Sequence, residues 1–288
     1  MGGEHISAGQ THQGRTWPGW ALAAVAVWVL GVFVLTLTPT GVAVTRAAML
    51  AATSVNTLAR HAPRAPQGAV QAHPFVGSDP VGALFRLNAG RLGPHFCTAT
   101  VVDSPSADLV VTAAHCVSGR SAGRIAFVPD YHADRKPFGV WVASRVLVDA
   151  AWQKSASPDH DVAFLVVHQA GNPRQVQQVT GGEHLGIGWR AEVPVVVIGY
   201  NSGNDGPIGC PRRTRPFGRR EMEIVCGGFF EGTSGGPFLM AVASQRGPGT
   251  VVGVIGGYEQ GGDLAPISYS PRFGHAVWSL YEAAVSAG

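Results

Sequence analysis

Short apolar runs bounded by Gly, Pro, Asp and Asn recur along the chain after residue 73. Runs of this length between turn residues predict β-strands, and their close spacing favours an all-β sandwich or barrel over alternating strand–helix units. The predicted strands are Ala83–Leu87, Thr98–Val102, Leu109–Thr112, Arg124–Val128, Val140–Val148, Val162–Val167, Val193–Ile198 and Val251–Ile255. In this part of the chain only 276–287 shows helical spacing, with Val277, Leu280 and Ala284 on one face, and it predicts a closing helix.

A different pattern marks the N-terminal part. Residues 20–38 carry no charge and approach the roughly 20 residues that a helix needs to cross a bilayer. Gly41-Val42-Ala43 just beyond them resembles a small-x-small cleavage site, so a cleaved signal peptide and a retained membrane anchor both stay open. We therefore expect a polar tail at 1–16, an export segment at 17–43, a linker or propeptide at 44–72 and a folded domain at 73–288. The linker includes a short helix near 47–58, and the domain lies outside the cytoplasm, secreted or anchored to the cell membrane.

Composition narrows the class of protein. Charged residues are only 14% of the chain and apolar residues 45%, which excludes a disordered polyelectrolyte. The 39 glycines and 20 prolines favour many turns between short strands. A net charge of +3 is too small for a nucleic-acid footprint, and the arginine cluster at 212–220 lacks interleaved aromatic residues. We expect no nucleic-acid partner and a monomer.

The cysteines all follow the export segment, at Cys97, Cys116, Cys210 and Cys226. An even number on the exported side predicts two disulfides formed in an oxidising compartment, and three pairings are open. A zinc site is the alternative, but the chain has neither a C-x-x-C nor an H-E-x-x-H motif. We expect no metal and no cofactor.

Three fragments carry candidate chemistry. The run LVVT leads directly into Ala113-Ala114-His115-Cys116, Asp161 opens a second apolar run, and Ser234 lies in the glycine-rich turn 232–237. Each fragment alone is weak, because a lone histidine, acid or loop serine is usually structural. Their conjunction on a β-rich chain points to acyl transfer, since a serine hydroxyl needs a base that takes its proton and imidazole can do so near neutral pH.

The other two groups complete that chemistry. A buried carboxylate at Asp161 would fix the imidazole tautomer and stabilise the imidazolium. The glycines allow the backbone to bend so that the N–H groups of Gly232 and Ser234 point at the oxyanion of a tetrahedral intermediate.

These residues resemble the chymotrypsin-like (trypsin-fold) serine proteases. TAAHC around His115, HDVAFL around Asp161 and GTSGGP around Ser234 are similar to the family's three signature blocks, in its order, and the resemblance covers roughly 73–288. It implies two antiparallel six-stranded β-barrels, at about 73–185 and 186–275, with the site between them and the helix 276–287 at the end. It also implies serine endopeptidase activity on protein or peptide substrates, and a Cys97–Cys116 disulfide.

Several departures make the chain look closer to the bacterial secreted branch of the family. Thr233 stands where the family usually has the aspartate that receives a new N-terminus, so activation by N-terminal insertion is not expected. Cys226 lies eight residues before Ser234, which favours a Cys210–Cys226 bridge that closes the arginine-bearing loop. Gly256 replaces a serine that commonly bonds the catalytic carboxylate, so the hydrogen bonds of Asp161 are in question.

Specificity is predicted from the residues that would line the substrate pocket: Gly228, Phe229, Ile255, Gly256, Gly257 and Tyr258. In trypsin an aspartate six positions before the nucleophile binds Arg or Lys, and here that position is Gly228. We therefore expect a medium or large apolar side chain. Glu231 and Glu259 at the rim support the alternative of a basic residue.

Two other functions stay open. A catalytically silent protease-fold module at the cell envelope would keep the scaffold without turnover. An esterase would use the same serine, but the G-x-S-x-G elbow of α/β hydrolases needs a parallel sheet and the order Ser, Asp, His, which this chain lacks.

Overall fold

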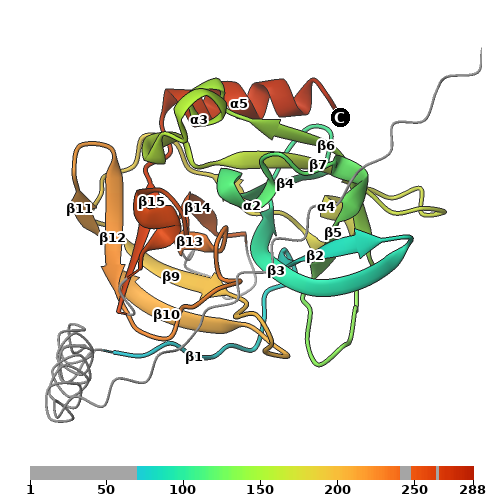
Figure 1. Cartoon of the computed structure of the whole chain (residues 1–288), viewed down its shortest axis with the longest axis horizontal. Helices are drawn as coiled ribbons and strands as arrows, with labels where there is room; N and C mark the ends of the chain where they lie inside the picture. The colour runs from blue at the N-terminus through green and yellow to red at the C-terminus, as the bar shows by residue number, and fades with distance from the viewer. Residues whose placement is uncertain (1–69, 241–247, 264–265) are drawn as a thin grey trace, which may run out of the picture. The chain divides into compact units, whose positions relative to one another are not determined.

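The computed structural model describes residues 70–240, 248–263 and 266–288, all within the unit Pro63–Gly288. These residues form mainly β-structure, with the strands of the first half on the right of Figure 1 and most strands of the second half on the left. The predicted export segment and the helix near 47–58 lie outside the described residues. Within the described part of the chain, no helix has the length and apolar character that crossing a membrane requires.

The first half forms a closed six-stranded barrel, as predicted. Its strands follow the order β2-β3-β4-β7-β6-β5, and every pair is antiparallel. The strands are β2 (Val81–Asn88), β3 (Arg91–Val101), β4 (Leu109–Thr112), β5 (Ile125–Pro129), β6 (Trp141–Val148) and β7 (Ala163–His168). Large apolar side chains such as Leu84, Phe127 and Trp141 fill the interior and are fully buried, which is the main stabilising contribution of this half.

The second half differs from the predicted second barrel. It consists of an open six-stranded sheet, in the order β1-β10-β9-β13-β14-β8, and a separate three-stranded sheet, in the order β11-β12-β15. The first sheet holds β1 (His73–Pro74), β8 (His184–Leu185), β9 (Pro194–Gly199), β10 (Ile208–Arg213), β13 (Pro237–Met240) and β14 (Thr250–Val254). The second holds β11 (Arg215–Phe217), β12 (Glu221–Val225) and β15 (Ile267–Pro271).

A disulfide, side-chain hydrogen bonds and a few single backbone bonds, rather than a continuous ladder, join these two sheets. The Cys210–Cys226 disulfide connects β10 to the end of β12, and the Arg212 Nε atom donates to the Val225 carbonyl at 3.1 Å. On the other side, the Val254 amide of β14 donates to the Ser270 hydroxyl at 2.9 Å. Among the described residues of the second half, no continuous strand pairing closes the two sheets into a barrel.

The helices are short except for the last. They are α2 (Ala114–Val117), α3 (Ala150–Ser155), α4 (Val176–Thr180) and α5 (His275–Val285), with 3-10 turns η1 (Ala122–Arg124), η2 (Pro158–His160) and η3 (Tyr258–Gly261). Helix α5, predicted at 276–287, packs on β6 and β7 of the first half, as the red helix in Figure 1 shows. Val277 and Ala284 are buried against a cluster that includes Phe164. The two halves therefore exchange terminal segments, since β1 pairs with β10 and α5 packs on the first barrel.

Both predicted disulfides are present, Cys97–Cys116 and Cys210–Cys226. Ligand atoms of Cys97, His115 and Cys116 lie within 4.8 Å of one another, the kind of grouping that could suggest a metal site. Because the two sulfurs are bonded to each other, neither offers the thiolate that would ligate zinc.

Candidate active site

His115 lies where the first barrel turns into a short helix. Strand β4 ends at Thr112 and α2 begins at Ala114, so His115 occupies the first turn beyond the strand. Its neighbours Ala114 and Cys116 are buried, whereas the His115 side chain keeps 12% of its surface exposed. The Cys97–Cys116 disulfide ties this turn to β3. The imidazole is therefore fixed at its base and open to solvent at its tip.

Asp161 is fully buried and accepts three hydrogen bonds. It lies directly after the 3-10 turn η2 and shortly before β7. Its Oδ2 atom lies 2.7 Å from His115 Nδ1 and 2.9 Å from the amide nitrogen of Gly257, and its Oδ1 atom accepts the His115 amide at 2.8 Å. These donors hold the carboxylate in position, and its bond to Nδ1 directs the other imidazole nitrogen outward.

The hydrogen bond from Gly257 answers the question raised by the missing serine. A Cβ atom on Gly256 would lie 2.9 Å from Asp161 Oδ2, so this position has no room for a side chain. Gly257 instead supplies a backbone donor with φ of 82°, a conformation that glycine adopts without strain. The next amide, of Tyr258, donates to Glu221 Oε1 at 2.6 Å, and burial followed by the charges of Asp159 and Asp161 raises the pKa of Glu221.

The turn that carries Ser234 is closed by Thr233. The Thr233 side chain points inward, is 3% exposed, and donates its hydroxyl to the Phe230 carbonyl at 2.7 Å. Its own amide reaches the same carbonyl at 3.1 Å, and its carbonyl accepts the Gly236 amide at 2.9 Å. The threonine therefore organises the turn through local hydrogen bonds.

Hydrogen bonds fix the directions of two carbonyl groups in the turn of Ser234, and these in turn set the directions of two amides. The Glu231 carbonyl accepts the Ser202 amide at 2.7 Å, and the Thr233 carbonyl is bound by Gly236. The described residues contain no cis peptide, and a trans peptide points its N–H opposite to its C=O, so the amides of Gly232 and Ser234 point away from these partners. Within residues 70–240, 248–263 and 266–288, neither amide donates to a protein acceptor.

Thr98 on β3 joins the two halves at this turn, a role that the sequence did not reveal. Its amide donates to the Ser234 carbonyl at 2.8 Å, and its hydroxyl donates to the Gly232 carbonyl at 2.9 Å. The same hydroxyl accepts the Tyr200 amide at 2.9 Å. Thr98 is completely buried, so these bonds are shielded from water and hold the serine turn against the first barrel.

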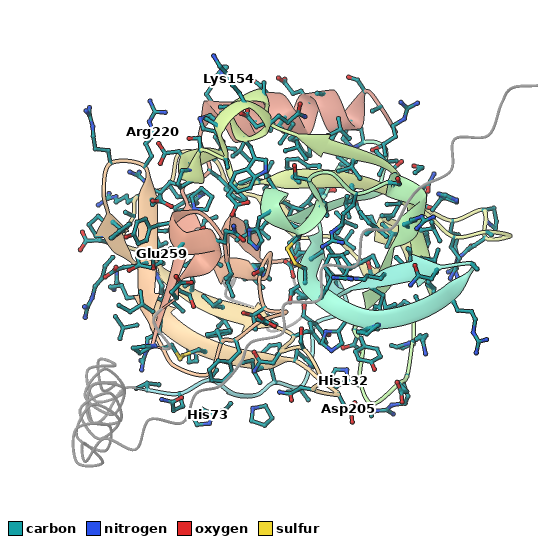
Figure 2. The ribbon with its side chains drawn as sticks, in the orientation of Figure 1. His73, His132, Lys154, Asp205, Arg220 and Glu259 are labelled. Atoms are coloured by element: carbon teal, nitrogen blue, oxygen red, sulfur yellow. A yellow bond between two sulfur atoms is a disulfide. The ribbon has the colours of Figure 1, made fainter. Side chains whose placement is uncertain are left out.

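A cavity of about 1050 Å³ contains both His115 and Ser234 in its lining. The wall from the first half carries the basic residues Arg86 and Arg120, and the wall from the second half carries the acidic residues Glu231, Glu259 and Asp263. Figure 2 shows Glu259 on η3. The same wall also carries apolar residues, of which Phe229 and Ile255 are buried, Ile267 is half-buried and Phe230 is exposed. The charge is thus unequal from one side of the cavity to the other.

A family model described as Trypsin matches residues 72–273, which is more than half of the chain. The chain belongs to the trypsin family. Protease Anisep from Arthrobacter nicotinovorans superposes with a TM-score of 0.63 and 21% identity, over 75% of this chain and 99% of that one. No curated protein matches the chain.

Two further solved structures share the trypsin fold with this chain. The thermostable serine protease AL20 from an extremophilic microorganism has a TM-score of 0.61 and 24% identity, over 73% of this chain and 99% of that one. Human heparin binding protein has a TM-score of 0.55 and 16% identity, over 76% of this chain and 97% of that one. At these identities the likeness shows the fold, so function has to come from the residues of this trypsin-family member.

The substrate-binding residues predicted for this trypsin-family chain are only partly collected in the cavity. Phe229 and Ile255 line it, together with the rim residues Glu231 and Glu259. Four others are not among its lining residues: Gly228, Gly256, Gly257 and Tyr258. Gly256 and Gly257 lie against Asp161 instead, and Tyr258 packs against Phe217 and Tyr269.

Sequence reasoning missed several cavity residues because they become neighbours only in the fold. Ser202 comes from the loop after β9, Gly261 ends η3 and Gly262 follows it, and Ile267 and Ser268 begin β15. Asn201 also acts here, since its side-chain amide donates to the Gly228 carbonyl at 2.9 Å and its oxygen accepts the Phe230 amide at 2.8 Å. No local motif marks Asn201 in advance.

Proposed function

We propose that this protein is a serine endopeptidase that hydrolyses peptide bonds through an acyl-enzyme intermediate on Ser234. The observation that carries the proposal is the buried Asp161–His115 hydrogen bond at 2.7 Å beside a cavity that also contains Ser234 and two unpaired turn amides. Membership of the trypsin family supports the same class of reaction.

Acylation begins at the scissile carbonyl carbon. The Ser234 oxygen attacks it while the Nε2 atom of His115 takes the hydroxyl proton, and negative charge moves to the carbonyl oxygen. The amides of Gly232 and Ser234 donate to that oxyanion. When the C–N bond breaks, the imidazolium returns the proton to the leaving nitrogen, so the first product departs as a neutral amine and the acyl group stays on Ser234.

Deacylation repeats these steps with water. His115 takes a proton from water, the resulting hydroxide attacks the ester carbonyl, and the same two amides hold the second oxyanion. Collapse of this intermediate returns the proton to Ser234 and releases a carboxylic acid. Throughout, Asp161 holds the imidazole in place, because it accepts bonds from the backbone amide and the Nδ1 atom of His115 and is itself held by the Gly257 amide.

For the side chain that precedes the scissile bond we propose a medium or large apolar group. The second-half wall supports this, since Phe229, Ile255 and Ile267 are apolar and Gly261 and Gly262 leave space beside them. We propose Gly228, Gly256, Gly257 and Tyr258 as a supporting frame for this pocket. A monomeric protein, exported or tethered through residues 20–38, fits the two disulfides, which persist in oxidising compartments.

A fluorophosphonate probe tests the proposal, because it reacts covalently with activated serines. We expect the full-length protein to be labelled and the Ser234→Ala variant to remain unlabelled. The control is Ser118→Ala, at an exposed serine, which should be labelled like the original protein. An unlabelled original protein would contradict the enzyme proposal and favour a catalytically silent module of the same fold. Human heparin binding protein, whose name records binding, shows why the fold alone does not decide this.

Substitution of Gly232 by alanine tests the oxyanion site separately. A Cβ atom there would lie 2.5 Å from the Ser202 amide nitrogen and 2.6 Å from the Tyr200 carbonyl oxygen, at a φ of 95°. The turn would have to move, and loss of an oxyanion donor typically costs about 10²–10³ in rate. We expect kcat/KM to fall by that factor.

The matched control for this substitution is Gly171→Ala. Gly171 also has a positive φ, of 75°, but nothing lies within 4 Å of the added Cβ. We expect this control to lose some thermal stability and to keep its kcat/KM within about twofold. If Gly232→Ala keeps the original kcat/KM, the assignment of its amide to the oxyanion is wrong.

A further inference from the structure

Arg86 and Arg120 lie over the same aromatic ring inside the candidate active site. The guanidinium carbon of Arg120 is 4.6 Å from the centroid of Phe96, and that of Arg86 is 5.9 Å from it. Arg86 comes from β2, and Arg120 follows α2. All three residues line the cavity that contains His115 and Ser234. Two cations are therefore gathered on one wall of the site.

Neither cation has a carboxylate partner in the protein. Within residues 70–240, 248–263 and 266–288, no ion pair includes Arg86 or Arg120. Burial lowers the pKa of Arg120, and the charge of Arg86 lowers it further. Two like charges that face the same ring without a counter-ion repel each other, and an anion between them would relieve that repulsion.

The donors that remain free suit a carboxylate. Arg120 uses its Nε atom to bind the Cys116 carbonyl at 2.6 Å, which fixes the plane of the guanidinium and leaves its two terminal nitrogens for another acceptor. No hydrogen bond is formed by the Arg86 guanidinium within the described part of the chain. A planar guanidinium with free terminal nitrogens can bind a carboxylate through two parallel hydrogen bonds.

The position of the pair relates it to the leaving group of the proposed reaction. In that reaction His115 gives its proton to the departing nitrogen, and Arg120 is bonded to the carbonyl of Cys116, the next residue. The apolar wall at Phe229, Ile255 and Ile267 belongs to the other half of the molecule. The acyl part of a substrate would occupy that wall, and the leaving part would pass the arginines.

We propose that Arg86 and Arg120 bind a carboxylate in the part of the substrate that follows the scissile bond. The carboxylate can come from an Asp or Glu side chain or from the free C-terminus of a short leaving peptide. On the opposite wall, Glu231, Glu259 and Asp263 repel an acidic residue that precedes the bond, so the charges of the cavity also orient the substrate. This inference rests on the proposed peptidase function and specifies its substrates.

The test uses the full-length protein and a library of internally quenched peptides, from which one rapidly cleaved sequence is chosen. Versions of this peptide carry Glu, Gln or Lys at the first or second position after the scissile bond, and each ends in either a free carboxylate or an amide. We expect Glu to raise kcat/KM over Gln by about tenfold at low salt, and less at about 0.5 M salt, because charge-assisted bonds at exposed arginines are screened. The amide-ended peptides separate the side chain from the terminal carboxylate as the source.

Variants of Arg86 and Arg120 test whether these two residues cause the preference for a carboxylate after the scissile bond. We expect Arg86→Gln and Arg120→Gln each to reduce the preference and the double variant to abolish it, while rates on the amide-ended Gln peptide, which offers no carboxylate, stay within about threefold. Arg120→Lys, which keeps the charge, should retain part of the preference. Arg124→Gln is the matched control, because Arg124 is exposed on η1 and does not line the cavity. Thermal melting of each variant checks that it is folded.

The outcomes separate this inference from the function on which it rests. Cleavage with a preference for Glu, or for a free C-terminus, that disappears in the double variant supports the inference. Cleavage at equal rates for Glu, Gln and Lys, with free and amidated ends alike, overturns the inference and leaves the peptidase proposal intact. If the preference also disappears in Arg124→Gln, the inference is overturned as well, since general surface charge would then explain the preference. No cleavage of any library peptide overturns both.

Discussion

Replacing Ser234 with alanine is expected to lower kcat by at least about 10⁴-fold, because the variant has no nucleophile and keeps only binding and oxyanion stabilisation. His115→Ala should have a loss of the same order, since the serine hydroxyl then has no base. The double variant should be little worse than either single one, because residues that act as a unit are not additive. The measurement is kcat on a peptide that the original protein cleaves.

The control for these kinetics is again Ser118→Ala, whose side chain is exposed and outside the cavity. Ser234 sits in a turn held by bonds of Thr98 and Thr233 to backbone atoms and to Phe230, none of which uses the serine hydroxyl. The Ser234→Ala variant should therefore fold normally, with an unchanged melting temperature. A folded variant that retains activity within tenfold of the original would show that Ser234 is not the nucleophile.

Much of the first half could be predicted from the sequence because its strands are continuous apolar runs. Leu109–Thr112 is buried at every position, and Ala163 to Val167 likewise, so both strands appear in the sequence as almost continuous apolar runs. The predicted strands at 83–87, 124–128 and 140–148 fall on β2, β5 and β6 for the same reason.

The second half was harder to predict because its strands combine apolar residues with breakers and charges. Strand β10 contains Pro211 and two arginines, β12 begins with Glu221, and β13 starts directly after the glycine turn of Ser234. Prolines and charges within a run argue against a central strand, yet β10, β12 and β13 each pair with a strand on both sides. The open sheet with its side-chain seams, in place of a second closed barrel, follows from contacts that no local pattern encodes.

The candidate site shows the same division between motif and context. The order of His115, Asp161 and Ser234 was readable because each lies in a distinctive local motif. The hydrogen bond from the Gly257 amide to Asp161, which takes the place of one from the missing serine, could not be predicted, because a backbone donor has no signature in the sequence. The bonds of Thr98 to the serine turn join residues more than a hundred positions apart, and only the folded chain brings them together.

Substitution of Asp161 by asparagine changes the site without changing its volume. Asp161 receives N–H donors at both oxygens, two at Oδ2 and one at Oδ1. An asparagine can accept at only one of these places and must present its NH₂ group at the other. If the NH₂ group takes the Oδ1 place, it opposes the His115 amide. If it takes the Oδ2 place, it opposes the Gly257 amide and selects the imidazole tautomer whose Nε2 carries the proton.

The imidazole tautomer with its proton on Nε2 has no lone pair directed at Ser234, so it cannot act as the base. We expect Asp161→Asn to lower kcat/KM by about 10³–10⁴-fold at neutral pH. The matched control is Asp159→Asn, in the same turn. Asp159 forms only a long ion pair with Arg220, at 4.0 Å, so the kcat/KM of this variant should stay within about twofold of the original. If Asp161→Asn keeps more than a tenth of the original kcat/KM, then Asp161 does not set the imidazole tautomer, and the buried Asp161–His115 bond serves the fold alone.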